Sequence, residues 1–246
     1  MENVGYLAYS RAALLERATD VSTNNIANAN TTGFRASQTI FESYVVDAKS
    51  GSDVTSISYG IDKGTISDLT AGALHRTGNP LDVAVSGDGW LGYMTAAGQT
   101  ALGRDGSLMM TAQGDLTTAS GDRILDVGGA PINIPPGTTD LTIARDGTIS
   151  AGNGDVIAQI GVFDAPDIAS WKKLGGSMLV PRDGGVDFNP VLEPTLMQGH
   201  VEQSNVNSIM EMARLVDLQR AYEQSMTLAS TADQLRKETL SRLRPK

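Results

Sequence analysis

The chain has 246 residues, of which 40% are apolar, and it carries a net charge of −9 at pH 7. This size and composition are typical of folded protein with one large or two modest domains, and no apolar run reaches the roughly 18 residues of a membrane span, so membrane insertion is not expected. The absence of cysteine excludes a disulfide framework, a thiolate metal site and a cysteine nucleophile.

Residues 1–34 are predicted to form a long helix. No glycine lies between Tyr6 and Thr32, and each interior glycine would cost a helix roughly 1 kcal/mol. A three-four spacing predicts a coiled-coil-like seam. Its members are Val4, Leu7, Arg11, Leu14, Ala18, Val21, Asn25 and Asn28. Gly33 is expected to end the helix in the left-handed conformation. Met1–Ser10 lacks the features of a Sec signal, so any export is expected to use another route.

Residues 35–75 are predicted to be an extended, loosely structured connector, because glycines interrupt them repeatedly. Residues 76–199 are predicted to form a mainly antiparallel β domain. Leu81–Val85 alternates like a strand, and Asp-Gly pairs favour hairpin turns. These pairs are Asp88-Gly89, Asp105-Gly106, Asp146-Gly147 and Asp183-Gly184. The segments Arg104–Leu108 and Arg145–Ile149 resemble one hairpin used twice.

Residues 200–246 are predicted to contain a second long helix. Ser208-Ile209-Met210-Glu211 has the form of a capping box, which predicts the start of the helix. A second three-four seam follows until Pro245. Its members are Met212, Leu215, Gln219, Tyr222, Met226, Ala229, Asp233, Arg236, Leu240 and Leu243.

The apolar stripes of both helices are wider than one seam. Ala8 and Leu15 widen the first stripe, and Val216 and Ala232 widen the second. One helix could cover only part of the other, so neighbouring subunits are expected to cover the rest. The predicted fold is therefore α+β and multidomain, with paired terminal helices around a β domain.

No motif for catalysis or cofactor binding has its required context. Gly87–Gly92 matches the dinucleotide pattern GxGxxG, but the residues after it continue as a strand, whereas a helix must start there to bind the pyrophosphate. His75 and His200 have no neighbours at metal-ligand spacing. We therefore expect no catalytic residues, no cofactor and no metal site.

The charge distribution argues against nucleic acid as a partner. The terminal segments 1–32 and 200–246 together carry as many basic as acidic residues, so the middle of the chain holds the whole charge of −9. An acidic domain repels phosphate backbones, and the basic residues near the C-terminus alternate with acidic ones.

Four motifs, in order along the whole chain, resemble those of the bacterial flagellar rod and hook proteins. They are residues 22–35 (STNNIANANTTGFR), residues 77–90 (TGNPLDVAVSGDGW), residues 199–207 (GHVEQSNVN) and residues 219–223 (QRAYE). The N-terminal sequence and length most resemble the F-type, proximal rod proteins. The G-type, distal rod proteins come second, and the length argues against a hook protein.

This resemblance implies a structural subunit, not an enzyme, of the periplasmic rod of the flagellar basal body. Such a subunit transmits torque. Its implied partners are other proximal and distal rod proteins, copies of itself and the flagellar export apparatus. Seam residues and motif residues are expected at the assembly interface. They are Leu7, Leu14, Val21, Asn24, Asn25, Ile26, Asn28, Gly33, Phe34, Ser204, Asn205, Val206, Met212, Leu215, Gln219, Arg220, Tyr222 and Met226.

Two alternatives from other classes remain open at this point. One is a nicotinamide-dependent enzyme built on Gly87–Gly92. The other is a carbohydrate- or surface-binding β module on a coiled-coil stalk. Dinucleotide titration would reveal the enzyme, and loss of flagella or of adhesion after gene deletion would separate the rod protein from the binding module.

Overall fold

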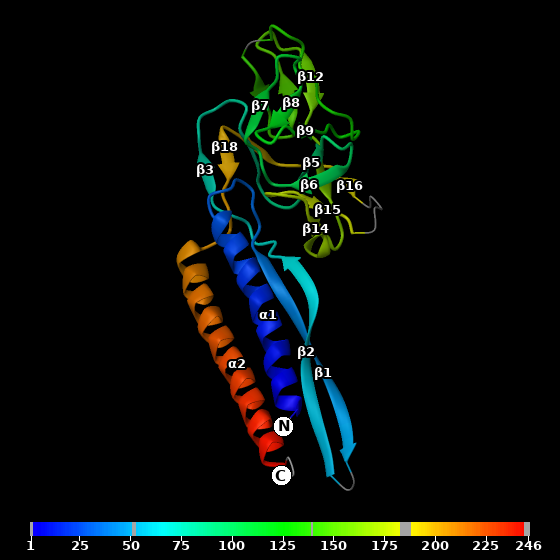
Figure 1. The fold of residues 1–246 in the computed structure, drawn as a ribbon. Coiled ribbons are helices and arrows are strands. Elements are labelled where there is room, and N and C mark those ends of the chain that lie inside the picture. The colour runs from blue at the N-terminus through cyan, green and yellow to red at the C-terminus, as the bar shows by residue number, and fades with distance from the viewer. Residues whose placement is uncertain (1, 51–52, 139, 183–187, 244–246) are drawn as a thin grey trace. The chain divides into compact units, whose positions relative to one another are not determined.

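The computed structural model describes residues 2–50, 53–138, 140–182 and 188–243 (Figure 1), and it describes side chains for residues 5–45, 59–138, 140–182, 188–239 and 241–242. The elements in chain order are α1 (Glu2–Ala27), β1 (Ser37–Ser50), β2 (Asp53–Ser67), β3 (Leu74–Arg76), β4 (Val83–Val85), β5 (Trp90–Met94), β6 (Thr100–Gly103), β7 (Leu108–Met110), β8 (Leu116–Thr118), β9 (Arg123–Ile124), β10 (Thr142–Ile143), β11 (Thr148–Ser150), β12 (Val156–Gln159), β13 (Val162–Asp164), η1 (Ile168–Ser170), β14 (Lys172–Lys173), β15 (Leu179–Val180), β16 (Asn189–Pro190), β17 (Leu196–Gln198), β18 (His200–Glu202) and α2 (Ser208–Leu243).

The chain forms two compact units. The helical unit comprises residues 1–27, 37–66 and 207–246, and the β unit comprises residues 28–36 and 67–206. The predicted N-terminal helix, antiparallel β domain and C-terminal helix are confirmed. Neither α1 nor α2 contains, in its described part, an apolar stretch that could cross a membrane.

In the helical unit, α1 packs against α2 and against β1. The two helices run in opposite directions side by side, and β1 and β2 pair as a two-stranded ribbon (Figure 1). At Gly60 of β2 the ribbon comes so close to α1 that an added Cβ would lie 2.2 Å from Leu14 Cδ1. Ser10 Oγ also donates to the Gly60 carbonyl at 3.4 Å. The ribbon therefore covers a face of α1 that α2 does not cover.

This ribbon corrects the prediction of a loosely structured connector over residues 35–75. The glycines suggested a loop, but Gly60 permits close approach of the strand to Leu14. The alternation of Tyr59 and Ile61 with Ser58, Gly60 and Asp62 is the period-two pattern that could have revealed the strand.

The start of α2 agrees with the prediction at Ser208, but the cap differs. The Asn207 side-chain oxygen accepts hydrogen bonds from the backbone amides of Ile209 and Met210, at 3.1 and 3.2 Å. The Glu211 carboxylate, predicted to close a capping box, instead accepts from Ser22 Oγ at 2.6 Å. A carboxylate within reach of a buried partner on α1 gains more there than at a solvated helix start.

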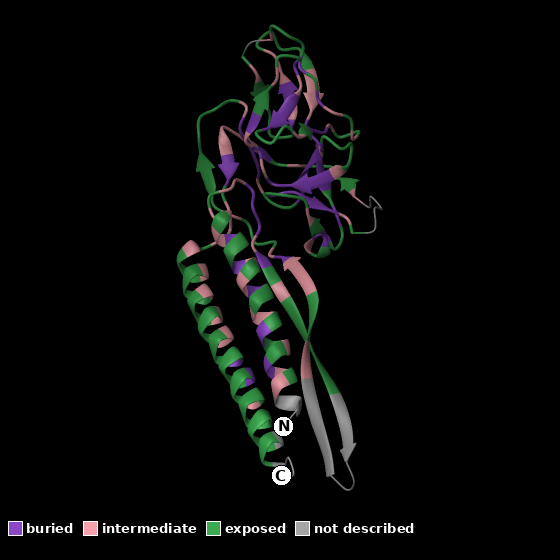
Figure 2. Ribbon diagram, in the orientation of Figure 1, coloured by how far each residue is buried: buried purple, intermediate pink, exposed green. Residues whose placement is uncertain are grey.

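The β unit is built from antiparallel pairs. Among the described residues, its largest sheet has nine strands, with β14-β15-β6-β5-β9-β8-β7 as the main order, β13 paired with β5, and β16 paired with β13. One apolar core gathers residues such as Val83, Leu91 and Tyr93, and a second surrounds Trp90 and Phe163. Purple ribbon in Figure 2 marks these buried strands.

The β unit extends beyond the predicted limits 76–199. β3 pairs with β18, with Val201 opposite His75, so residues on both sides of those limits belong to the same unit. Strand pairing between segments this far apart in the sequence leaves no local signal.

The Asp-Gly pairs have mixed outcomes. Asp146-Gly147 joins the paired strands β10 and β11, which confirms that hairpin. Asp88-Gly89 lies at a bend and Asp105-Gly106 lies in irregular chain. Neither forms a hairpin, because β4 pairs with β17 and β7 pairs with β8. The predicted repeat of one hairpin is therefore wrong. Asp183-Gly184 lies outside the described residues.

Candidate functional site

Arg35, Trp90, Arg104 and Glu202 form a buried cluster in the β unit, here called the Glu202 cluster. Arg35 Nη1 lies 2.7 Å from Glu202 Oε1, and Arg104 Nη1 lies 3.2 Å from Glu202 Oε2. The exposed fraction is 1% for Arg35 and Glu202 and 6% for Arg104 and Trp90. One carboxylate thus joins two residues that are far from it in the sequence.

The Glu202 cluster holds one more positive than negative charge. The Trp90 ring and nearby backbone carbonyls stabilise the extra positive charge. The guanidinium carbons of Arg35 and Arg104 lie 5.5 and 5.1 Å from the Trp90 ring centroid, within range of cation–π attraction. Arg104 also donates to the carbonyls of Val85 and Gly87. Burial lowers the pKa of Arg104, and the charge of Glu202 opposes that shift.

The backbone around this cluster brings together two of the four motifs, residues 22–35 and residues 199–207. The amides of Gly33 and Gly72 donate to the carbonyl and to the carboxylate of Glu202, at 2.7 and 2.8 Å. Gly33 has φ +65°, as predicted, and a Cβ there would lie 2.2 Å from the Arg104 carbonyl carbon. Any other residue at position 33 would therefore meet both backbone strain and a clash.

Lys173 contacts the segment that directly follows Gly33. Its ammonium group lies 3.8 Å from the Phe34 ring centroid and donates a hydrogen bond to the Arg35 carbonyl. Desolvation lowers the pKa of Lys173 to about 8.

Two motif asparagines also make contacts inside the chain. Asn25 is buried, and its amide group bonds to both the amide and the carbonyl of Ser37, at 2.8 and 2.9 Å. Asn205 accepts from the Ala36 amide at 2.7 Å and donates to the carbonyls of Asp68 and Thr70. These asparagines fix turns and strand ends where the backbone lacks a regular partner.

The face of α2 that packs on α1 differs by one residue from part of the predicted seam. The less exposed positions at three-four spacing are Glu211, Leu215, Leu218, Tyr222, Ser225, Ala229 and Ala232. Leu215, Tyr222 and Ala229 were predicted, whereas Met212 and Met226 are 54% and 37% exposed. Small residues such as Ser225 were overlooked because a seam was expected to be large and apolar.

The opposite face of α2 exposes large apolar side chains. Ile209, Met212 and Val216 follow one another at three-four spacing and are 79%, 54% and 43% exposed; they are here called the outer stripe. Figure 2 shows the exposed residues along this helix in green. A single exposed apolar residue needs no explanation, but a row of them on one helix face indicates a binding surface.

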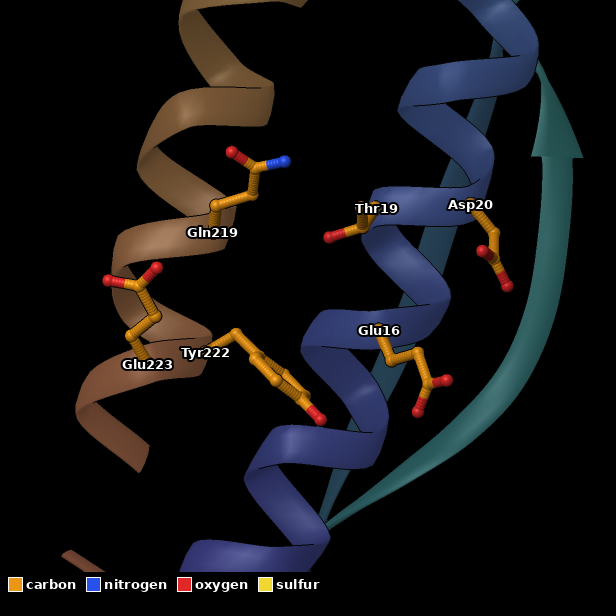
Figure 3. A pocket seen from close by; sticks show the side chains of 6 residues that line it. All are labelled: Glu16, Thr19, Asp20, Gln219, Tyr222 and Glu223. Carbon is orange, nitrogen blue, oxygen red and sulfur yellow. The ribbon is translucent and has the colours of Figure 1, made fainter. Parts of the chain in front are cut away.

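A groove of about 400 Å³ lies between α1 and α2. It is lined by Glu16, Thr19, Asp20, Gln219, Tyr222 and Glu223 and is here called the acidic groove. Figure 3 shows Tyr222 and Gln219 extending toward α1, with Glu16 and Asp20 on the α1 side and Glu223 on the α2 side.

The residues predicted at the assembly interface fall into three groups. Leu14, Asn25, Gly33, Phe34 and Asn205 make contacts within their own chain. Leu7, Val21, Ile26, Asn28, Ser204, Val206, Leu215 and Tyr222 are partly exposed. Asn24, Met212, Gln219, Arg220 and Met226 are exposed. The side chains of Val4, Leu240 and Leu243 lie outside the described residues.

The Glu202 cluster was not predicted. Arg35, Trp90 and Glu202 belong to the motifs that carried the resemblance, but no role was assigned to them. The available signal was the position of charged Arg35 and Glu202 directly beside apolar Phe34 and Val201.

The sequence motifs that are typical of cofactor or metal binding do not lie in the structural surroundings that those functions require. Residues 90–94 form strand β5, so the glycines of Gly87–Gly92 lead into a strand and not into a helix. In the described part of the chain, no three His, Cys, Asp or Glu residues are grouped so that they could hold a metal ion.

Comparison with known proteins gives matches along the chain. Residues 6–35 match the family model described as "Flagella basal body rod protein", residues 84–151 match "Flagellar hook protein FlgE/F/G D1 domain", and residues 197–243 match "Flagellar basal body rod FlgEFG protein C-terminal". The flagellar basal-body rod protein FlgF of Mesorhizobium japonicum is 36% identical over 95% of this chain and 96% of its own length. The chain belongs to the flagellar basal-body rod protein family.

Other relatives in this family agree. The rod protein FlgF of Caulobacter vibrioides is 31% identical over 99% of this chain and 98% of its own length. The rod protein FlgG of Agrobacterium fabrum is 30% identical over 88% and 90%. The chain is a structural subunit of the flagellar rod, in the basal body. Arg35, Arg104 and Glu202 each lie in a different one of the three matched regions, so the Glu202 cluster joins all three.

Proposed function

We propose that this chain is a proximal-rod subunit that joins copies of itself and other rod proteins through its two terminal helices, in the periplasmic part of the basal body. Its α1–α2 pair forms a coiled-coil-like unit, and neighbouring subunits cover the surfaces that this pair leaves exposed. The protein works as a mechanical part that transmits torque and has no catalytic role.

The observation that carries this proposal is the outer stripe of α2. Burial of apolar area contributes roughly 25 cal/mol per Å², so a row of half- or mostly exposed apolar side chains is stabilised when a neighbour covers it. The ribbon of β1 and β2 already covers one face of α1, whereas the outer stripe of α2 stays exposed. This refines the prediction that both helices leave wide stripes for neighbours.

The proximal assignment is supported by the relatives named FlgF at 31–36% identity. Relatives named FlgG also match, at 30% in A. fabrum. Delivery by the flagellar export apparatus is part of this proposal, and the periplasmic location proposed for the rod supports it.

A double substitution, Ile209→Glu and Met212→Glu, tests the role of the outer stripe. Both side chains are exposed, and an acidic residue in the first turn of a helix is favourable, so the free chain should keep its unfolding midpoint within a few degrees. In cells that lack the native gene, the variant should restore few basal bodies and little motility.

The matched control is Gln224→Glu, which adds charge to an exposed position of the same helix. It should restore motility fully. Normal motility with the double variant would show that the outer stripe is not an assembly contact. Absence of the native chain from purified basal bodies, imaged by electron microscopy, would overturn the proposed function as a whole.

A further inference from the structure

The Glu202 cluster contains two buried hydrogen-bond donors that lack an acceptor. They are Nε of Arg35 and Nε of Arg104, which form no hydrogen bond to any described residue. The side chains of these two arginines are only 2% and 6% exposed. Buried N–H groups are nearly always bonded to the protein, to water or to a ligand, so two orphaned donors in one cluster require an explanation.

The other contacts of the two guanidinium groups do not use these atoms. Arg35 bonds through Nη1 to Glu202 and to the Thr70 carbonyl. Arg104 bonds through Nη1 to Glu202 and to the Val85 carbonyl, and through Nη2 to a further backbone carbonyl. The Nε–H group of each arginine is therefore left for a partner from outside the chain.

The charge balance indicates which kind of partner fits. Arg35 and Arg104 bring two positive charges, and their salt bridges with described side chains are both formed with the single carboxylate of Glu202. The Trp90 ring and the carbonyl dipoles lower the cost of the extra charge, but they do not carry a full negative charge. A water molecule would satisfy the donors only, whereas an anion would also neutralise the cluster.

The arrangement of the cluster favours a small anion. Arg35 and Arg104 bind the two oxygens of one carboxylate, and both guanidinium carbons lie within 5.5 Å of the Trp90 ring centroid, so the two groups surround a common region. The neighbouring backbone is closely packed, because a Cβ at Gly33 would lie 2.2 Å from the Arg104 carbonyl carbon. A single-atom anion fits such surroundings better than a phosphate or a carboxylate.

We propose that the Glu202 cluster binds one small monovalent anion, such as chloride, which accepts hydrogen bonds from Arg35 Nε and Arg104 Nε. With the anion bound, the cluster holds two positive and two negative charges. The anion completes the contact that joins the three matched regions of the chain, and it makes the stability of the β unit depend on the anion in the solution. This inference does not depend on how rod subunits contact one another.

Bromide gives a direct test, because it can replace chloride and scatters X-rays anomalously. Crystals of the full chain are soaked in sodium bromide, and data are collected at the bromine absorption edge. An anomalous peak is expected within hydrogen-bond reach of Arg35 Nε and Arg104 Nε. A well-ordered cluster without such a peak, whether or not water occupies it, would overturn the inference.

Stability in solution gives a second readout. At constant ionic strength, replacement of gluconate by chloride should raise the thermal unfolding midpoint of the native chain by about 3 °C or more, because a ligand that binds only the folded state stabilises it. Arg104→Met removes one positive charge and one orphaned donor, so it should abolish this dependence. The control Arg123→Met replaces an exposed arginine of the same unit and should keep it.

Equal midpoints of the native chain in chloride and in gluconate would also overturn the inference. If Arg104→Met does not fold, the bromide crystals and the titration of the native chain still decide the question. Neither result bears on the proposed function, which rests on the outer stripe of α2 and is tested by the assembly of basal bodies.

Discussion

Glu202 bonds to four residues of the β unit that are far from it in the sequence. Its carboxylate bonds to Arg35, Arg104 and the Gly72 amide, and its carbonyl accepts from Gly33. A buried ion pair adds modest net stability, because desolvation offsets the attraction, but removal of one partner leaves a buried charge without compensation.

Glu202→Gln should therefore lower the free energy of unfolding by about 3 kcal/mol or more, because two buried guanidinium groups lose their counter-charge. Urea denaturation of the free chain measures this change. The control is Glu42→Gln, which breaks the exposed Lys63–Glu42 pair at 2.7 Å and should cost less than about 1 kcal/mol. Equal losses in both variants would show that the Glu202 cluster is not a main source of stability.

Lys173 makes stability depend on pH in a defined direction. Burial lowers its pKa from 10.5 to about 8 in the folded chain, so between pH 8 and 10.5 the unfolded chain binds more protons than the folded one. Stability contributed by this residue must then rise with pH across that window.

Comparison with Lys173→Met isolates this effect. The free energy of unfolding of the native chain, minus that of the variant, should increase as the pH rises from 8 to 10.5, and should be constant between pH 6 and 7. Urea titrations at each pH measure it. A difference that falls with rising pH would mean that the contacts of the charged ammonium with Phe34 and the Arg35 carbonyl outweigh its burial.

Residue roles were only partly predictable from the sequence. The left-handed conformation of Gly33 was predicted correctly, but its predicted role was wrong: α1 ends at Ala27, so Gly33 does not end the helix. Its amide instead bonds to the Glu202 carbonyl, a contact between distant segments that has no local signal. Asn25 was expected to set register between subunits, but it bonds to Ser37 in its own chain. A polar seam residue has the same sequence signal whether its partner belongs to its own chain or to another.

At the level of elements, the two helices were predictable and the ribbon of β1 and β2 was not. A helix can be predicted from the three-four spacing of its apolar residues and from the absence of glycine, and both are local features of the sequence. Gly60 weakened the strand signal of β2, although its lack of a side chain is what lets the ribbon approach Leu14. The seam of α2 was partly misplaced, because the small residue Ser225 is buried where the larger Met226 was expected.

The cap of α2 gives a prediction at this scale. Asn207→Ala removes the side-chain oxygen that accepts from the amides of Ile209 and Met210, and it should cost about 1 kcal/mol of stability. Ser208→Ala, at the predicted capping-box position, should change stability by less than about 0.5 kcal/mol. Urea denaturation compares the two, and a larger loss for Ser208→Ala would restore the capping-box interpretation.

At the level of the whole molecule, the two units differ in how much apolar area they bury on their own. The β unit has two apolar clusters with many fully buried side chains. In the helical unit, α2 exposes large apolar residues and buries mainly small ones. The helical unit should therefore be the less stable part of the free chain.

Hydrogen exchange on a dilute monomer tests this expectation. Amides of α2 should exchange faster than those of β5 and β6, and they should become protected in assembled basal bodies, where neighbours cover the helix. Strong protection of α2 in the monomer, equal to that of the β strands, would contradict the proposal that assembly completes the terminal helices.

The position of Glu202 late in the sequence has a consequence for how the protein is delivered. A polypeptide that emerges N-terminus first from a narrow conduit carries Arg35, Gly72 and Arg104 past the exit long before their common acceptor arrives. If the proposed export delivers this chain in that order, the Glu202 cluster can form only after residue 202 has followed. Completion of the β unit would then depend on arrival of the C-terminal segment.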